Sequence, residues 1–296
     1  MKIFLSFSLL LLVLGSPLCA QQKLKRRPGT TDVRGPAHTV RIEHTEFTTS
    51  DGKTVEEPRV LRVITEYSED GTAVQTRQFD PATALLLHQL DETYDVAGRL
   101  LEARYYNRDG TPNSRQTRTY DDGGRLSEIT AFRPDGARLS LTVYQYSPEQ
   151  NTSETTMYDP NGLVTGHATH KASVVGERTP GEDLRERRTE ALSYNAAGAV
   201  RIQSSIKTNP DHSQEFRAED SNGTFQRSVS KTTGQGQTEE ISYGSDGRIL
   251  KRTKRTTELD SYGNVKKVLT SVAVGDSENF VPTEAFYWTV TYYAKD

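Results

Sequence analysis

Two seven-residue stretches that lie 26 residues apart decide the fold: Tyr94-Asp-Val-Ala-Gly-Arg-Leu100 and Tyr120-Asp-Asp-Gly-Gly-Arg-Leu126. In each stretch an aromatic residue stands four positions before a glycine, and an aliphatic residue follows two positions after that glycine. Type I turns favour Asp or Asn at the first position and Gly at the fourth, and Gly accepts the positive φ angle of a following β-bulge. Each stretch therefore predicts a tight turn that joins two strands.

The same unit recurs along most of the chain, and the step between aromatic positions alternates between 12 and 14 residues. The repeat positions on which the fold prediction rests are Tyr94, Gly98, Leu100, Tyr106, Gly110, Tyr120, Gly124, Leu126, Phe132, Gly136, Tyr158, Gly162, Tyr194, Gly198, Tyr243 and Gly247. The step from Gly162 to Gly198 is ten residues longer than one unit. We therefore expect an inserted loop near residues 174–187, which contain a Thr-Pro-Gly turn.

These units predict an all-β protein, an antiparallel meander of repeated β-hairpins that forms a curved or superhelical sheet. Strands of ordinary length fill the gaps between turns, for example Leu126–Phe132 and Val265–Val272. A β-propeller is the alternative, because two units approach the length of a four-stranded blade. Contact between the first and last strands is expected to separate these two arrangements. The aliphatic position after each glycine is expected to face the buried side.

The first residues have the layout of a signal peptide. Lys2 precedes an apolar run from Ile3 to Leu14, and Ala20 offers a small residue before the polar Gln21. We expect residues 1–20 to be a signal peptide, residues 21–37 a flexible basic linker and residues 38–296 the repeat domain. Lipid attachment at Cys19 is the less favoured alternative. The protein is thus expected to be secreted, periplasmic or at the cell surface.

The net charge and the cysteine content limit the classes of partner and site that are expected. The chain has a net charge of −3 and one cysteine, which lies within the expected signal peptide. No general attraction to nucleic acid follows from this charge, and the mature chain is expected to have no disulfide and no thiolate metal site. After signal removal no apolar run is long enough for a transmembrane helix.

The units resemble the YD repeat of RHS-type proteins. The resemblance is most specific at the Tyr94 and Tyr120 units, and it extends in looser copies over roughly residues 67–272. It implies an exported or surface-exposed protein whose repeats form a long antiparallel β-strip that encloses or binds something. The chain has fewer units than the large members of that family and ends in an ordinary strand rather than a toxin domain. The toxin-capsule role is therefore not carried over.

No motif predicts an active site. His167 and His170 are three residues apart on an expected strand and so should face opposite sides, which excludes a shared metal. We expect no catalytic, cofactor-binding or metal-binding residues, and no enzyme activity. The expected function is a structural or interaction module whose partner is an unidentified protein or polysaccharide at the cell surface. The alternatives are a carbohydrate-binding protein that uses a tyrosine-lined sheet face, and a hydrolase whose site is assembled from distant turns.

Overall fold

The computed structural model describes residues 33–175, 186–209, 211–233, 236–274 and 277–293. The expected signal peptide, Cys19 and most of the expected linker lie outside the described residues. So do residues 176–185 of the expected insertion, although Val175 and Glu186 pair across from each other where β11 ends and β12 begins. No helix in the described ranges is long and apolar enough to cross a membrane.

Over these described ranges the structure is all-β, apart from one turn of 3-10 helix at Pro148–Gln150. The strands are β1 (Ala37–Ser50), β2 (Lys53–Glu56), β3 (Val60–Tyr67), β4 (Ala73–Phe79), β5 (Leu86–Tyr94), β6 (Leu100–Tyr106), β7 (Pro112–Tyr120), β8 (Leu126–Phe132), β9 (Arg138–Ser147), β10 (Thr152–Tyr158), β11 (Val164–Val175), β12 (Glu186–Asn195), β13 (Val200–Thr208), β14 (Gln214–Asp220), β15 (Phe225–Thr232), β16 (Gln237–Tyr243), β17 (Ile249–Leu259), β18 (Val265–Val274) and β19 (Val281–Tyr292).

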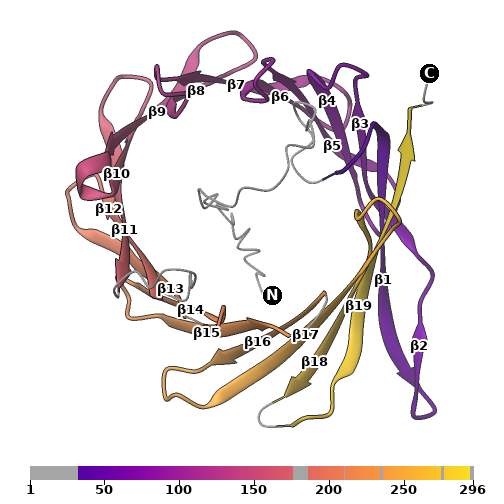
Figure 1. Cartoon of the computed structure of the whole chain (residues 1–296). Coiled ribbons are helices and arrows are strands. Elements are labelled where there is room, and N and C mark those ends of the chain that lie inside the picture. Colours follow the sequence, from indigo (N-terminus) through magenta and orange to yellow (C-terminus); the bar gives the residue numbers. More distant parts are fainter. Residues whose placement is uncertain (1–32, 176–185, 210, 234–235, 275–276, 294–296) are drawn as a thin grey trace, which may run out of the picture.

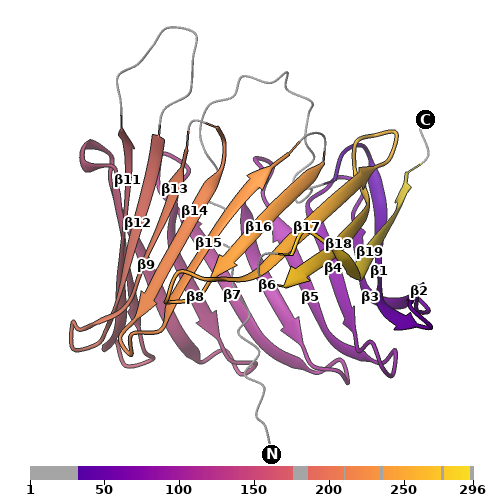
Figure 2. The ribbon, with the colours of Figure 1, turned by 90° about the horizontal axis from the view of Figure 1, so that it is seen from below.

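The strands form one closed antiparallel barrel (Figures 1 and 2). From β3 to β19 each strand pairs with the next in sequence, and β1 closes the ring by pairing with both β3 and β19. Only β2 stands outside the ring, where it forms a hairpin with the far end of β1. The hairpin projects beyond the barrel wall (Figure 1).

The predicted arrangement as an open curved or superhelical sheet was therefore wrong, and so was the propeller alternative. The first and last strands do meet, but along a continuous ladder from Ala37↔Tyr292 to Glu46↔Glu284, with no separate blades. A twisted sheet of this many strands curls, and closure removes both free edges. The repeats define the hairpins, whereas the pairing of the two ends of the sheet joins residues more than 200 positions apart.

Local side-chain contacts explain why the turns form where the repeat places them. Asp95 Oδ1 accepts hydrogen bonds from the backbone N–H groups of Ala97 (2.9 Å) and Arg99 (2.8 Å). Gly98 completes the turn at a φ of 81°, a conformation that side chains with a Cβ rarely adopt. A one-residue bulge follows, so that Tyr94 pairs with Leu100. The turn and the bulge together set the register of the hairpin.

The barrel wall is one sheet thick, so little of it is deeply buried. The buried apolar side chains of the described residues are mostly small, and they include Ala103 and Ala285. Many strand residues are half-buried on both faces, as in β16, where every residue is intermediate. Stability must therefore come mainly from ladder hydrogen bonds and from side chains that cover one another within each face.

Candidate functional site

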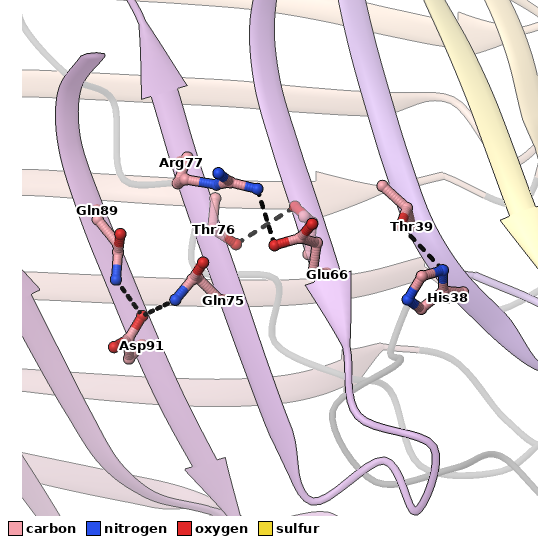
Figure 3. Close-up of polar contacts among 9 residues, drawn as sticks. His38, Thr39, Glu66, Gln75, Thr76, Arg77, Gln89 and Asp91 are labelled. Carbon is pink, nitrogen blue, oxygen red and sulfur yellow. Dashed lines mark hydrogen bonds and ion pairs between the residues drawn. The ribbon is translucent and has the colours of Figure 1, made fainter.

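The two faces of the wall can be told apart at β3, β4 and β5. Figure 3 shows Glu66, Arg77 and Asp91 on the near side of these strands, with the opposite wall of the barrel behind them. These side chains therefore lie on the outer face. Because successive residues of a strand alternate between faces, Glu92 and Tyr94 lie on the inner face. The pairing of β5 with β6 and onward extends this assignment around the wall.

A hollow of about 470 Å³ lies in this part of the wall. Seven of its residues form two rows across the ladder, and Tyr67, Ser68, Val74 and Glu92 also line it. Gln75 pairs with both Glu66 and Asp91, and Asp91 pairs with Arg104 on its other side, all of them on the outer face. In the adjacent row Ala73 pairs with Thr93, which pairs with Glu102. The small side chains of Ala73 and Thr93 leave room beside the larger ones of the first row.

Asp91 is half-buried and lies in the middle of the first row. Its Oδ1 accepts hydrogen bonds from Gln75 Nε2 (3.1 Å) and Gln89 Nε2 (2.9 Å), as Figure 3 shows. The two amides hold the carboxylate in one orientation. Among the described residues, no arginine, lysine or histidine forms an ion pair with Asp91.

The other two carboxylates of these outer-face rows, Glu66 and Glu102, have guanidinium partners. Arg77 Nη2 lies 2.8 Å from Glu66 Oε2 (Figure 3). Arg104 and Arg115 both contact Glu102, the latter at 3.2 Å. The hydrogen bond from Arg104 to Glu102, together with the charge of that carboxylate, raises the pKa of Arg104. Arg104 therefore turns toward Glu102 rather than toward Asp91, its direct ladder partner.

The turn beside the hollow is held by an exposed carboxylate. Asp70 accepts hydrogen bonds from the hydroxyls of Ser68 (2.7 Å) and Thr72 (2.8 Å) and from the Thr72 backbone N–H. The Ser68 hydroxyl, followed by the two Thr72 donors, lowers the pKa of Asp70 to about 2. Asp70 is therefore ionised at neutral pH and fixes the rim of the hollow.

The repeat positions predicted from sequence lie at the ends of strands. The aromatic residues occupy the last or next-to-last position of β5, β6, β7, β8, β10, β12 and β16, and Leu100 and Leu126 begin β6 and β8. All the predicted glycines have positive φ angles. These residues are spread around the barrel and build its hairpins, and they do not converge on one site.

At one end of the barrel the repeat aromatics face inward. The Tyr120 hydroxyl donates to the Leu100 carbonyl (2.8 Å), and the Tyr146 hydroxyl donates in the same way to Leu126 (2.9 Å). The guanidinium of Arg99 lies 4.9 Å from the centre of the Tyr120 ring. These tyrosines thus link each hairpin to the next, and both ring and hydroxyl have protein partners.

At the other end the equivalent aromatics face outward. Phe132 lies on the outer face, because successive cross-strand pairs place it in one row with Asp91, Arg104 and Arg115. Neighbouring hairpins turn at opposite ends with the same geometry, so the aromatic position changes face from one end to the other. The aliphatic position follows it, and the expectation that it always faces the buried side was wrong. Leu100 on the inner face is 9% exposed, whereas Val200, which pairs with Tyr194, is 45% exposed.

A cluster of polar side chains lies on the inner face around Arg118. Burial raises the pKa values of Glu92, Tyr94 and Tyr144. The Nε of Arg118 is buried and has no hydrogen-bond partner. The positive charge of Arg118 partly offsets the burial of all three groups, which indicates that they share one region of the inner wall.

The two histidines singled out from the sequence do not meet. His167 pairs with Tyr194 and His170 with Ala191, on opposite faces of β11. Burial lowers the pKa of His170. Within the described residues no group of three or more His, Cys, Asp or Glu side chains is placed to hold a metal ion.

The hollow was not predicted from the sequence. Asp91, Gln75 and Gln89 lie outside the repeat motif, and their spacing resembles no known ligand pattern. A weak signal was present in Ala73, since alanine is depleted in strands. The signal has meaning only when the register that pairs Ala73 with Thr93 is known.

Comparison with known proteins gives structural similarity without close relatives. No family model matches the sequence, and no curated protein matches it. The fold is similar to the crystal structure of a porin-like protein from Bacteroides uniformis, with a TM-score of 0.42 and 13% identity over 89% of this chain and 100% of that one. Similarity to TcdB2-TccC3 has a TM-score of 0.16 and 12% identity, over 82% of this chain and 20% of that one. TcdB2-TccC3-TEV gives 0.15 and 12%, over 86% and 21%.

Proposed function

We propose that the chain is an exported YD-repeat-type protein that acts as a structural and interaction module at the cell surface, with the outer wall of its barrel in water. One observation carries the proposal: cross-strand ion pairs on the outer face of many strands. They include Arg77–Glu66 (2.8 Å), Arg227–Glu215 (2.7 Å) and Arg252–Glu239 (2.6 Å).

These pairs weigh against a lipid-facing wall. Facing the bilayer midplane, each arginine on a barrel costs about 2–4 kcal/mol. A wall that carries several of them, with their carboxylate partners, is stable only in water or against a polar partner. The outer face is thus suited to contact with a protein or a polysaccharide.

Two alternative functions have less support. A tyrosine platform for sugars needs free ring faces, but Arg125 covers Tyr146 at 4.9 Å in the same way that Arg99 covers Tyr120. A glycosidase needs a pair of carboxyl groups free to act as acid and base or nucleophile. In the hollow, Glu66 and Glu102 are each bound to a guanidinium, and Asp91 and Glu92 are successive residues of β5 that face opposite sides of the wall.

The test is the solubility of the mature protein. The chain from Gln21 onward is expected to stay monomeric or in a small defined oligomer without detergent, with a β-rich circular dichroism spectrum. In cells that make the full chain, a carbonate wash at high pH should release it from membranes. A folded barrel that needs detergent and resists the wash would contradict the proposal.

A further inference from the structure

The hairpin of β1 and β2 has an open strand edge. The strands of the ring have a neighbour on each side, whereas β2 pairs with β1 alone in the described part of the chain. All four residues of β2, Lys53–Glu56, are exposed. Figure 1 shows that this hairpin projects beyond the barrel wall. The edge of β2 is therefore a place where a further strand can be added to the sheet.

The register of the hairpin identifies the backbone groups on the open edge. Glu57 donates its N–H to the Glu46 carbonyl (3.0 Å), so its backbone groups point toward β1. The direction of these groups alternates along an antiparallel strand. Val55 therefore also bonds to β1, whereas Thr54 and Glu56 turn their N–H and C=O groups outward.

We propose that a second copy of this chain pairs with this edge, so that two β2 strands meet antiparallel about a two-fold axis at Val55. Residues whose backbone groups point outward must lie opposite each other in such a ladder. With the axis at Val55, Thr54 of each copy lies opposite Glu56 of the other, and each pair exchanges two backbone hydrogen bonds. Pro58 ends the ladder, because proline has no N–H. The two hairpins become one four-stranded antiparallel sheet.

The side chains on one face of the hairpin complement themselves in this register. Lys53, Val55 and Glu57 share that face, because side chains alternate along a strand. Val55, which is 44% exposed, meets Val55 of the second copy at a position without hydrogen bonds, where opposite side chains lie closest. Lys53 of each copy lies opposite Glu57 of the other, so two pairs of opposite charges form. Lys53 has no ion-pair partner among the described residues, and is thus available for this contact.

The neighbouring registers that the backbone allows lack this match. An axis at Glu56 places that carboxylate opposite its own copy, and like charges directly opposite each other destabilise a sheet. An axis at Thr54 places Glu57 opposite Asp51, which is again a pair of like charges. The axis at Val55 sets opposite charges against each other, so the sequence of the edge favours one register over its neighbours.

Pairing of the two hairpins rests on the proposed function only in requiring that the hairpin lies in water. The experiment is sedimentation equilibrium of the chain from Gln21 onward, without detergent and over a wide range of concentrations. The contact is small, so we expect a weak dimer with a dissociation constant on the order of 10–100 μM. Circular dichroism and thermal unfolding of each variant establish that it is folded.

A charge reversal tests the register. Lys53→Glu sets like charges opposite each other at both ends of the contact, and it should raise the dissociation constant about tenfold. Glu57→Lys should have the same effect through two pairs of cations. The double variant Lys53→Glu/Glu57→Lys restores opposite charges across the axis, and its dissociation constant should return to within about threefold of the parent value. A general defect in folding would not be rescued in this way.

A second substitution tests the axis itself. Val55→Asp places two carboxylates directly opposite each other, and the dimer should be lost at every concentration measured. Val200 is a matched control, because it is similarly exposed (45%) and begins β13, which pairs with both β12 and β14. Val200→Asp should leave the dissociation constant unchanged.

Three outcomes would overturn this inference: a parent protein that stays monomeric up to about 1 mM, a dimer that persists in Val55→Asp, or no rescue in the double charge reversal. In the first case, Lys53 and Pro58 would serve to protect a short edge from pairing. Each of these outcomes leaves a soluble, folded barrel, so the proposed function would stand. A barrel that folds only in detergent breaks the proposed function instead, and the two failures are thus distinguishable.

Discussion

The regular wall from β5 to β10 and the closure seam, which is built by β1, β18, β19 and the turn before β18, use the same turn for different purposes. At two turns of the wall, the residue after the turn glycine is an arginine, Arg99 or Arg125, and each covers a tyrosine of the next hairpin. In the seam the same position is Asn264, only 2% exposed. Its amide donates to the Arg34 carbonyl (3.0 Å) and to the Tyr292 hydroxyl (2.7 Å).

The difference is one of sequence distance. Wall contacts join residues about one repeat apart, such as Tyr146 and Leu126. The seam adds contacts between residues more than 200 positions apart, such as Arg34 and Asn264. The wall can form hairpin by hairpin, since each unit contacts mainly its neighbours. The seam forms only when both ends of the chain have arrived, so it should determine whether the barrel is closed.

The largest effect is expected from Asn264→Ala. The substitution removes the side-chain partner of the Arg34 backbone carbonyl and N–H, and the donor that the Tyr292 hydroxyl accepts from, at the buried position of Asn264. This should cost about 2–3 kcal/mol of unfolding free energy. Arg125→Ala, at the same repeat position in the wall, removes an exposed ion pair and a ring contact and should cost less than about 1 kcal/mol. Urea denaturation measures both. Equal midpoints for the two variants would remove the distinction between seam and wall.

The next effect compares two tyrosine hydroxyls. Tyr292 donates to the Asp260 carboxylate (3.0 Å), and hydrogen bonds to charged groups are worth about 1.5–3 kcal/mol. Tyr146 donates to a neutral carbonyl (2.9 Å), worth about 1 kcal/mol. Tyr292→Phe should therefore destabilise more than Tyr146→Phe in thermal or urea unfolding. If Tyr146→Phe destabilised more, the seam hydroxyl would not contribute more to stability than the wall hydroxyl.

A wall glycine gives a smaller and more local effect. Gly124 has a φ of 77°, and a Cβ there has room, since the nearest atom beyond its chain neighbours would be Arg99 Nη1 at 3.6 Å. The cost of Gly124→Val thus comes from the backbone, about 1–2 kcal/mol for any side chain and more for a β-branched one. Hydrogen exchange should report faster opening in β7 and β8 alone. Glu128→Gln is the control and should cost under about 0.5 kcal/mol. If β1 and β19 also lost hydrogen-exchange protection, the effect of the substitution would not be confined to the neighbouring hairpins.

The smallest expected effect per residue is the stability that each turn aspartate loses at low pH. Hydrogen bonds, first those from the backbone N–H groups of Arg99 and Arg125, lower the pKa values of Asp95 and Asp121, and Ser68 lowers that of Asp70 to about 2. A lowered folded-state pKa stabilises the fold above the unfolded value of 3.8 and loses that contribution as pH falls toward 2. Stability should thus decline from about pH 4 to pH 2. In Asp70→Asn, the unfolding free energy should fall less between about pH 4 and pH 2 than in the parent. If the two pH profiles are the same, the Asp70 carboxylate does not contribute to the decline.

The sequence determined the hairpins because the forces that make them are local. Gly98 and Gly124 allow a left-handed backbone, the aspartates hold the turns, and strand ends follow within a residue or two, as in β8 at Leu126–Phe132. Only the tertiary structure decided that the sheet closes, because no motif marks Asn264 as a partner of Arg34. It also decided the hollow, since Asp91 gains its two amides and its small neighbours through the register of three strands rather than through their spacing in the chain.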